Sequence, residues 1–561
     1  MKIQAFAKKY FFDAVALGIL GFAVLLVVKP MRANEGMWRV FDDVHIARSE
    51  ALLEELQAGQ FPVRMLQSFG NGGGYPLFNY YSPLTYYLSA GLIYIGINPL
   101  NSVKLLFQGA YVLLAVGMYF YLRSGIKVSK KLALAGAVAA IFSAYFNYDA
   151  YTRGALAELL GFALLPSLLG LFELLYTKKK WYYLFGSALF LSLIFFFHAI
   201  TGIIAVLLLS VLVVVRLAIR KEAIVAQVSS LSAFFGLSGL LSAAYLLPVL
   251  LEKNYVRYSQ VGFVQTGFKD AAVSLKEILG FTSINPEIKP ITLGIGLSLL
   301  VAMSLCVLIQ KYFKMNNKSR FSAVSSALVS YAAVLLTILF LQTPLSWIFW
   351  EHSSILQTLQ FPYRFLSLLT VLSIAFVLKT SAQYLNRPMT ATVVVLILIA
   401  SYQTRYFAVP SSYYFSDRFA AEDSCTTTTW QQEYLPVATK ECIIKDSLPL
   451  AQGMNGTEVV SQSLSERNRI LIELNAEPGT IILSKYYFPG WTAYSGLTKL
   501  PIYPTTESGL LTIEIPENTT QIQVVLEKTQ TQKTAEWISV ITAVFMILYA
   551  IHRTTQVVTQ R

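Results

Sequence analysis

The sequence predicts a mainly α-helical membrane protein with many spans and a C-terminal β-sandwich domain outside the membrane. Of the 561 residues, 55% are hydrophobic and 13% charged, and the mean hydropathy of +0.55 lies above the range of soluble globular domains. Apolar runs long enough to cross about 30 Å of hydrocarbon recur along most of the chain. Near the C-terminal end, a polar stretch instead alternates apolar and polar residues, as β-strands do.

The first apolar run, 11–28, is expected to stay in the membrane as an anchor, because no cleavage-site pattern of small residues ends it. The basic residues Lys2, Lys8 and Lys9 precede this run. The positive-inside rule therefore places the N-terminus in the cytoplasm and residues 30–100 outside.

The apolar segment 83–97 is predicted to lie in the interface or to re-enter, because it is short and contains three tyrosines. A crossing there would place the basic residues of 123–131 outside and invert every later loop. Without it, about twelve spans keep nearly every basic loop and both termini in the cytoplasm of a plasma-membrane protein. The expected spans are 11–28, 102–122, 131–147, 157–176, 182–197, 200–216, 226–249, 291–310, 321–341, 364–379, 389–407 and 536–551.

The chain divides into three predicted parts: a transmembrane domain at 1–407, a β-rich domain outside the membrane at 408–533, and a final helix with a cytoplasmic tail at 534–561. Period-two runs that favour strands occur at 469–474, 480–484 and 511–515. The aromatic segment 486–491 could stack on carbohydrate, but core and turn positions are the preferred interpretation.

The net charge of +13 does not indicate a nucleic-acid partner, because Lys and Arg gather in short segments between apolar runs. Cys306 lies within an apolar run. Cys425 and Cys442 share the segment expected outside the membrane, where disulfides persist, and we predict a bridge between them.

The predicted topology gathers uncommon polar side chains on the outer side. A charge at hydrocarbon depth costs at least about 2.5–3.5 kcal/mol, so those just inside spans are expected to face a polar cavity. The group comprises Asp42, Asp43, His45, Asn147, Asp149, Tyr151, Arg153, Glu158, His198, Thr201, Glu252, Lys253, Arg257, Glu351, His352, Gln360, Tyr363 and Arg364.

Simpler roles remain open for several of these residues. Asp42 or Asp43 could cap an amphipathic helix over 44–57, whose apolar face is opposite Arg48, Glu50, Glu54 and Glu55. His198 could be an interhelical histidine, and Arg153 or Arg364 could extend to the interface.

Oxygen ligands for a divalent cation could come from Asp43, Asp149 and Glu158. The sequence contains no zinc-binding spacing and no glycine-rich phosphate loop. The run 70–74 is rich in glycine but follows no predicted strand, so we expect a flexible loop there.

Several motifs resemble known membrane families. Asp42-Asp43, the amphipathic helix that follows and Tyr81-Ser82-Pro83-Leu84 resemble the first external loop of GT-C glycosyltransferases. A closer resemblance, over nearly the full chain, is to the bacterial membrane proteins called 6-pyruvoyl-tetrahydropterin synthase-related, akin to the YfhO-like family. The motifs that carry it are Arg153-Gly-Ala-Leu-Ala-Glu158, His198-Ala-Ile-Thr201, Gln360-Phe-Pro-Tyr-Arg-Phe365 and Tyr487-Phe-Pro-Gly-Trp491.

The GT-C resemblance implies a transferase that moves a sugar from a polyprenyl-phosphate donor to a cell-envelope glycan or protein. Asp42 or Asp43 would be its catalytic base, and many members have Asp-Glu where this chain has Asp-Asp, which leaves the choice open. Substrate would be bound by His45, Tyr151, Arg153, Glu158, His198, Tyr363 and Arg364. No cofactor is implied except a divalent cation as an option.

Two other functions compete with the transferase. A transporter or flippase for a lipid-linked intermediate would require polar residues through the bilayer midplane and paired discontinuous helices, and the sequence shows no internal repeat. The third interpretation is a non-catalytic envelope protein whose β-domain binds a glycan.

Overall fold

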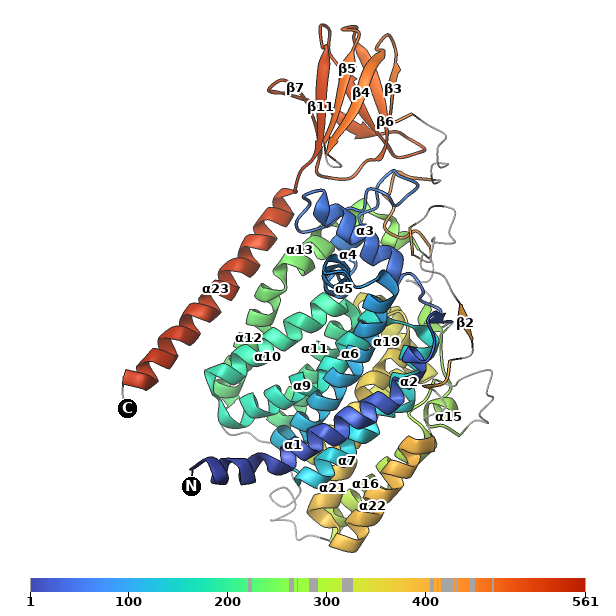
Figure 1. The fold of residues 1–561 in the computed structure, drawn as a ribbon. Coiled ribbons are helices and arrows are strands. Elements are labelled where there is room, and N and C mark those ends of the chain that lie inside the picture. The colour runs from blue at the N-terminus through green and yellow to red at the C-terminus, as the bar shows by residue number, and fades with distance from the viewer. Residues whose placement is uncertain are drawn as a thin grey trace.

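In the computed structural model a helical bundle carries a β-rich region at one end, and the last helix leads from that region back along the outside of the bundle (Figure 1). The structure describes residues 2–219, 224–261, 267–269, 271–281, 291–314, 326–403, 408–410, 412–414, 425, 427–429, 431–440, 442, 449–466 and 469–559.

The helices of the bundle and its loops have the following bounds: α1 Lys2–Val27, α2 Lys29–Arg32, α3 His45–Gln57, α4 Leu77–Tyr80, α5 Leu84–Tyr94, α6 Pro99–Phe120, η1 Tyr121–Ile126, α7 Lys130–Ile141, α8 Ala144–Tyr148, η2 Asp149–Arg153, α9 Leu156–Lys178, α10 Trp181–Phe197, α11 Ala199–Ile219, α12 Ile224–Leu241, α13 Ala243–Glu252, η3 Lys253–Tyr255, η4 Arg257–Gln260, α15 Leu275–Ile278, α16 Ile295–Phe313, α18 Ser326–Leu341, η5 Pro344–Ser346, α19 Trp347–Glu351, α20 Ser354–Thr358, η6 Pro362–Phe365, α21 Leu366–Tyr384, α22 Arg387–Gln403 and α23 Gln530–Thr559.

Seven helices among the described residues are long and apolar enough to cross a membrane, or up to nine if each of two bent pairs is one span. Shorter apolar helices cover Phe11–Val27, Trp181–Phe197 and Arg387–Tyr402. The predicted segments thus contain apolar helices, and the count of twelve spans stays a prediction.

Burial separates central from peripheral helices. The apolar stretch of the span that contains α9 is 83% buried inside the protein, and that of the span that contains α21 is 89% buried. The apolar stretch of α23 is only 11% buried. Helices that are apolar on every face pack in the centre of a bundle. The charged residues inside α9, Glu158 and Glu173, are therefore surrounded by protein.

The loop between α2 and α6, residues 33–98 and here called the first loop, folds over the β-domain end of the bundle (Figure 1). Its helix α5 has 11 residues, about 16 Å in length, which is too short to cross about 30 Å of hydrocarbon. The amphipathic α3 differs from expectation, because Arg48 and Glu55 on its polar face are 5% and 0% exposed.

The C-terminal region contains two antiparallel sheets, ordered β3-β6-β10-β9 and β4-β5-β11-β7-β8. Alternate side chains of β5 are buried, which agrees with the period-two pattern. A short pair, β1 with β2, ties the first loop to Tyr413–Tyr414. The strands are β1 Met37–Trp38, β2 Tyr413–Tyr414, β3 Ala451–Met454, β4 Val459–Glu466, β5 Arg469–Leu474, β6 Gly479–Tyr486, β7 Trp491–Ser495, β8 Thr498–Leu500, β9 Ile502–Pro504, β10 Leu510–Ile515 and β11 Gln521–Leu526.

The first loop and the β-strands share one hydrophobic core, which includes Leu52, Tyr75 and Ile481. The segment expected to be a flexible glycine loop packs under Tyr486, whose N–H donates to the carbonyl of Gly73 at 2.8 Å. Tyr486, Phe488 and Trp491 are at most 3% exposed, so these aromatics lie in the core.

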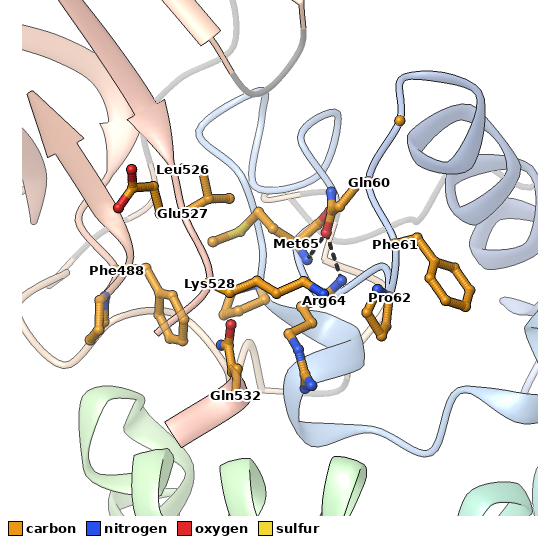
Figure 2. A pocket seen from close by; sticks show the side chains of 13 residues that line it. Gln60, Phe61, Pro62, Arg64, Met65, Phe488, Leu526, Glu527, Lys528 and Gln532 are labelled. Carbon is orange, nitrogen blue, oxygen red and sulfur yellow. Dashed lines mark hydrogen bonds between the residues drawn. The ribbon is translucent and has the colours of Figure 1, made fainter. Parts of the chain in front are cut away.

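A cleft of about 190 Å³ lies where the first loop meets the β-region and the start of α23. Figure 2 shows Phe488, Leu526 and Lys528 on one side of it and the segment Gln60–Met65 on the other. Below it, Arg64 pairs with Glu536 of α23 at 3.0 Å. The first loop is thus joined to the start of α23 by a mostly buried ion pair, and to the β-strands by apolar packing.

Candidate functional site

The turn between η2 and α9 carries two of the predicted site residues, Arg153 and Glu158. Gly154 makes this turn with a φ of +71°, a conformation that favours glycine. A Cβ on Gly154 would lie 2.5 Å from the Cβ of Val40, so the first loop packs directly on this glycine. There the N–H of Asp42 donates to the carbonyl of Arg153 at 2.8 Å. The main chain thus holds Asp42 beside the turn.

A buried charge cluster lies next to this turn. Arg153 Nη1 donates to Asp149 Oδ1 at 2.8 Å and to Glu158 Oε2 at 2.9 Å. Arg364, at the start of the α21 span, donates from Nε to the same Glu158 oxygen at 3.1 Å. Tyr145 donates its hydroxyl to Glu158 Oε1 at 2.9 Å. Residues far apart in the chain thus meet at one carboxylate, and these four charged side chains are at most 8% exposed.

The two arginines retain unused donors. Nη1 of Arg364 also donates to the Leu359 carbonyl at 2.8 Å and to Gln360 Oε1 at 2.9 Å. Among the described residues, Arg153 Nε and Nη2 and Arg364 Nη2 have no hydrogen-bond partner, and Asp149 Oδ2 is buried without one. Guanidinium groups bind phosphate oxygens through such paired donors.

The Gln360–Phe365 motif forms an aromatic wall against the cluster. The Phe361 and Tyr363 rings stack with centroids 5.3 Å apart. The Arg153 guanidinium lies 5.5 Å from the centre of the Tyr363 ring, and the Arg364 guanidinium lies 4.8 Å from that of Phe361. These cation–π contacts fix the planes of the two guanidinium groups.

His45 connects the first loop to the same turn. Its Nε2–H donates to the Gly154 carbonyl at 2.6 Å, and the Tyr86 hydroxyl, 3.1 Å from Nδ1, donates to that nitrogen. The hydrogen-bond network therefore assigns a neutral imidazole with its proton on Nε2. Burial lowers the pKa of His45 to about 4, against the opposing effects of the Gly154 hydrogen bond and the Asp42 carboxylate.

Asp42 and Asp43 lie at the edge of the cluster, Asp42 exposed and Asp43 half-buried. The N-cap position of α3 is occupied by Val44, not by Asp42 or Asp43. Asp42 lies close enough for its charge to act on both His45 and Arg48.

His198 and Tyr151 lie in other surroundings. The imidazole of His198, at the junction of α10 and α11, has Nδ1 2.8 Å from the hydroxyl of Thr201, and its charge would act on Glu158. Tyr151 turns away from the cluster and donates to the Val27 carbonyl at 2.6 Å. Its contacts join the end of α1 to η2.

Asp43, Asp149 and Glu158 are the residues that the sequence offers as possible ligands of a divalent cation. In the part of the chain that the structure describes, no three His, Cys, Asp or Glu side chains are grouped to hold a metal ion. The Asp149 and Glu158 carboxylates instead share Arg153.

Sequence reasoning missed two groups of buried polar residues. The Arg48 guanidinium donates to the Tyr86 hydroxyl at 3.0 Å, although the helical pattern placed Arg48 on a solvent face. At the other end of α9 and α11, Glu173 pairs with Arg216 at 2.5 Å. The position of Glu173 inside an apolar run could have indicated a buried partner, because a charge within a membrane span is costly.

The fold and the cluster define a mainly helical membrane protein with a buried arginine–carboxylate site at the β-domain end of its bundle. The family described as "6-pyruvoyl-tetrahydropterin synthase related domain; membrane protein" matches residues 78–415. The chain belongs to this family of membrane proteins. A comparison with the curated proteins found no match.

Two solved structures resemble the chain at low identity. The oligosaccharyltransferase of Archaeoglobus fulgidus, tethered to an acceptor peptide, is 12% identical with a TM-score of 0.44, over 73% of this chain and 56% of its own. The arabinofuranosyltransferase AftD from Mycobacteria is 13% identical with a TM-score of 0.45, over 72% of this chain and 27% of its own. The chain thus matches little more than half of the first structure and about a quarter of the second.

Proposed function

We propose that this protein is an integral-membrane glycosyltransferase. It takes a sugar from a polyprenyl-phosphate donor in the outer leaflet and transfers it to a cell-envelope glycan or protein. The observation that carries the proposal is the convergence of Arg153 and Arg364, with unused donors, beside a turn that holds an exposed carboxylate at Asp42.

The arginines act on the leaving group. When the bond between the sugar C1 and the phosphate oxygen breaks, its electron pair stays on the phosphate. Nη2 of Arg153 and of Arg364 can donate charge-assisted hydrogen bonds to that anion. Glu158 holds both guanidinium groups before substrate arrives, so little reorganisation is needed at the moment of reaction.

The carboxylate acts on the acceptor. As the acceptor hydroxyl oxygen forms its bond to C1, its proton passes to Asp42, which serves as general base. We favour Asp42 over Asp43 because Asp42 is exposed and its main chain is bonded to Arg153. We assign the positioning of substrate to His45 and Tyr363, which contact the turn and Arg153, and to His198, whose charge would act on Glu158.

The proposed topology has about twelve spans in the plasma membrane, cytoplasmic termini, and an outward first loop and β-sandwich, with domains at 1–407, 408–533 and 534–561. The Cys425–Cys442 disulfide supports an oxidising environment for that side. The predicted basic loops supply the orientation.

A transporter for a lipid-linked intermediate is the second candidate, and the buried Glu173–Arg216 pair at the opposite end of the helices favours it. Polar groups at both ends of the helices would suit a path through the bundle.

A transfer assay separates these functions. Purified protein is given a panel of radiolabelled polyprenyl-phosphate sugars and cell-envelope acceptors. We expect transfer by the native chain, a fall in kcat of about 10²–10⁴-fold in Asp42→Asn, and a smaller fall in Asp43→Asn.

Glu54→Gln, which changes an exposed carboxylate on α3, is the matched control and retains transfer. Equal rates in Asp42→Asn and native protein would remove Asp42 as base. Movement of labelled lipid across proteoliposomes without transfer would favour the transporter.

A further inference from the structure

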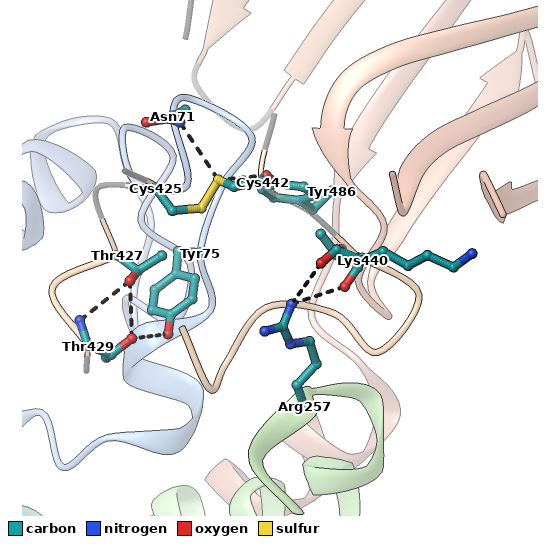
Figure 3. Close-up of a disulfide and its surroundings, with 10 residues drawn as sticks. Asn71, Tyr75, Arg257, Cys425, Thr427, Thr429, Lys440, Cys442 and Tyr486 are labelled. Carbon is teal, nitrogen blue, oxygen red and sulfur yellow. Dashed lines mark hydrogen bonds between the residues drawn. A yellow bond between two sulfur atoms is a disulfide. The ribbon is translucent and has the colours of Figure 1, made fainter. Parts of the chain in front are cut away.

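The loop closed by the Cys425–Cys442 disulfide lies against the first loop, next to Asn71 and Tyr75 (Figure 3). Cys425 is fully buried. The Thr429 hydroxyl lies 2.6 Å from the hydroxyl of Tyr75 in the first loop. The N–H of Tyr434 also donates to the Tyr75 hydroxyl, at 3.1 Å. The described part of this loop is therefore attached to the first loop at several points.

Thr428, within this loop, contacts Arg48. Arg48 Nε donates to the Thr428 hydroxyl at 2.9 Å, and Nη2 donates to its carbonyl. Thr428 has a φ of +59°, and its carbonyl and hydroxyl both accept from the same guanidinium group. The arrangement binds the arginine in a two-point contact.

Arg48 is 5% exposed, and the carboxylates whose charge acts on it, Asp42 and Glu433, do not hydrogen-bond to it in the described part of the chain. Its orientation therefore depends on neutral acceptors, namely Thr428 and the hydroxyl of Tyr86, 3.0 Å from Nη1. A buried arginine that donates no hydrogen bond to a carboxylate must keep such bonds, because unpaired donors of a charged group are costly.

Tyr86 passes this constraint to the site. Its hydroxyl accepts from Arg48 and donates to His45 Nδ1. His45 in turn donates to the Gly154 carbonyl, next to the Arg153 carbonyl that holds Asp42. One continuous chain of hydrogen bonds thus runs from Thr428 through Arg48, Tyr86 and His45 to the turn of the charge cluster.

We infer that the disulfide-closed loop is a positioning element of the transfer site, and that Thr428, Arg48, Tyr86 and His45 are its positioning residues. The loop holds Arg48, and the hydrogen-bond chain then fixes the place of Asp42 relative to Arg153. This inference rests on the proposed function for its catalytic consequence, while the hydrogen-bond chain can be tested alone.

The first test removes single hydroxyl groups. Tyr86→Phe deletes the link between Arg48 and His45, and Thr428→Val deletes one acceptor of Arg48. We expect kcat for transfer to fall about tenfold or more in both, with KM for the acceptor changed less than about threefold, because binding surfaces stay and alignment is lost. Thr428→Ser keeps the hydroxyl and restores the native kcat.

Matched controls lie beside the chain. Tyr87→Phe removes the neighbouring hydroxyl of α5, which accepts from Val63 N–H instead. Lys440→Gln changes an exposed residue within the disulfide-closed loop. Both keep native kcat and KM.

The second test opens the loop. In Cys425→Ser/Cys442→Ser, hydrogen exchange measured by mass spectrometry is expected to speed up at least tenfold in peptides covering 39–49 and 153–157, with peptides of β5 and β11 unchanged. If the peptide 39–49 exchanged at the rate of the native protein in both this variant and Tyr86→Phe, the inference would be overturned, whatever the transfer assay shows. Faster exchange without any transfer in the native protein would instead retain the hydrogen-bond chain and reject the proposed function.

Discussion

One oxygen of Glu158 accepts hydrogen bonds from Arg153 and Arg364, and the other accepts from Tyr145. Breaking a buried ion pair by removing one partner typically costs about 3–5 kcal/mol, because the remaining charge stays buried. We therefore expect Glu158→Gln to lower the free energy of unfolding by about this amount and to abolish transfer.

Thermal unfolding of the detergent-solubilised protein measures this loss. Glu351→Gln, which breaks an exposed pair with Lys269, is the control and should cost at most about 1 kcal/mol. An unchanged melting temperature in Glu158→Gln would contradict the account of the cluster.

His45 predicts a pH dependence of stability. Its pKa in the folded protein is about 4, below the ordinary value of about 6.5. The unfolded chain therefore binds the proton first, and stability present above about pH 6.5 is lost as the pH falls toward 4, by up to about 3 kcal/mol. His45→Gln should flatten the difference between pH 6.5 and 4 in denaturant melts.

The exposed residue His552 supplies the control. The free energy of unfolding of His552→Gln should change with pH as that of the native protein does. If the free energy of unfolding of His45→Gln also changed with pH as in the native protein, His45 would not be buried in its neutral form.

At the scale of the elements, the η2–α9 turn depends on Gly154. Alanine there would be strained at φ +71° and would place its Cβ 2.5 Å from Val40. We expect Gly154→Ala to cost about 2–4 kcal/mol, since both strain and overpacking contribute, and to release the first loop. Circular dichroism melts measure the loss.

Gly109→Ala provides the comparison, because its Cβ would meet nothing within 4 Å in the middle of α6. That substitution should be neutral or slightly stabilising. If Gly154→Ala were equally harmless, the close packing of Val40 on the turn would be disproved.

Most elements could be predicted from periodicity, including the apolar helices and the alternating strands of the C-terminal region. The burial of the polar face of α3 could not be predicted, because residues of this face bond to residues far away in the chain. Arg48, for example, donates to Thr428. The charge cluster was anticipated only as a set of residues on one side. Its pairing depends on how η2, α9 and α21 meet, which no local pattern encodes.

At the scale of the whole molecule, the β-region is held to the bundle through the segment 70–74. A Cβ on Gly73 would lie 2.6 Å from the Tyr486 ring, and Lys485 donates to the Gly72 carbonyl at 2.6 Å. Gly73→Ala should therefore push β6 away and cost about 1–3 kcal/mol. Faster hydrogen exchange in peptides covering 479–486 would report it.

Gly91→Ala on α5, where a Cβ meets nothing within 4 Å, should leave that exchange at the native rate. Native exchange in Gly73→Ala would mean that this contact does not hold the β-region.

The most direct test of the central claim is a comparison of two lipids that differ only in phosphate. Binding of farnesyl phosphate and farnesol to purified protein is measured in detergent for native protein, Arg364→Lys and Arg257→Gln. If Arg153 and Arg364 hold the phosphate of the donor, native protein and Arg257→Gln bind farnesyl phosphate at least about tenfold more tightly than farnesol. Arg364→Lys, which keeps the charge without the planar fork, loses most of that preference. Equal affinity of the native protein for both lipids would contradict the account.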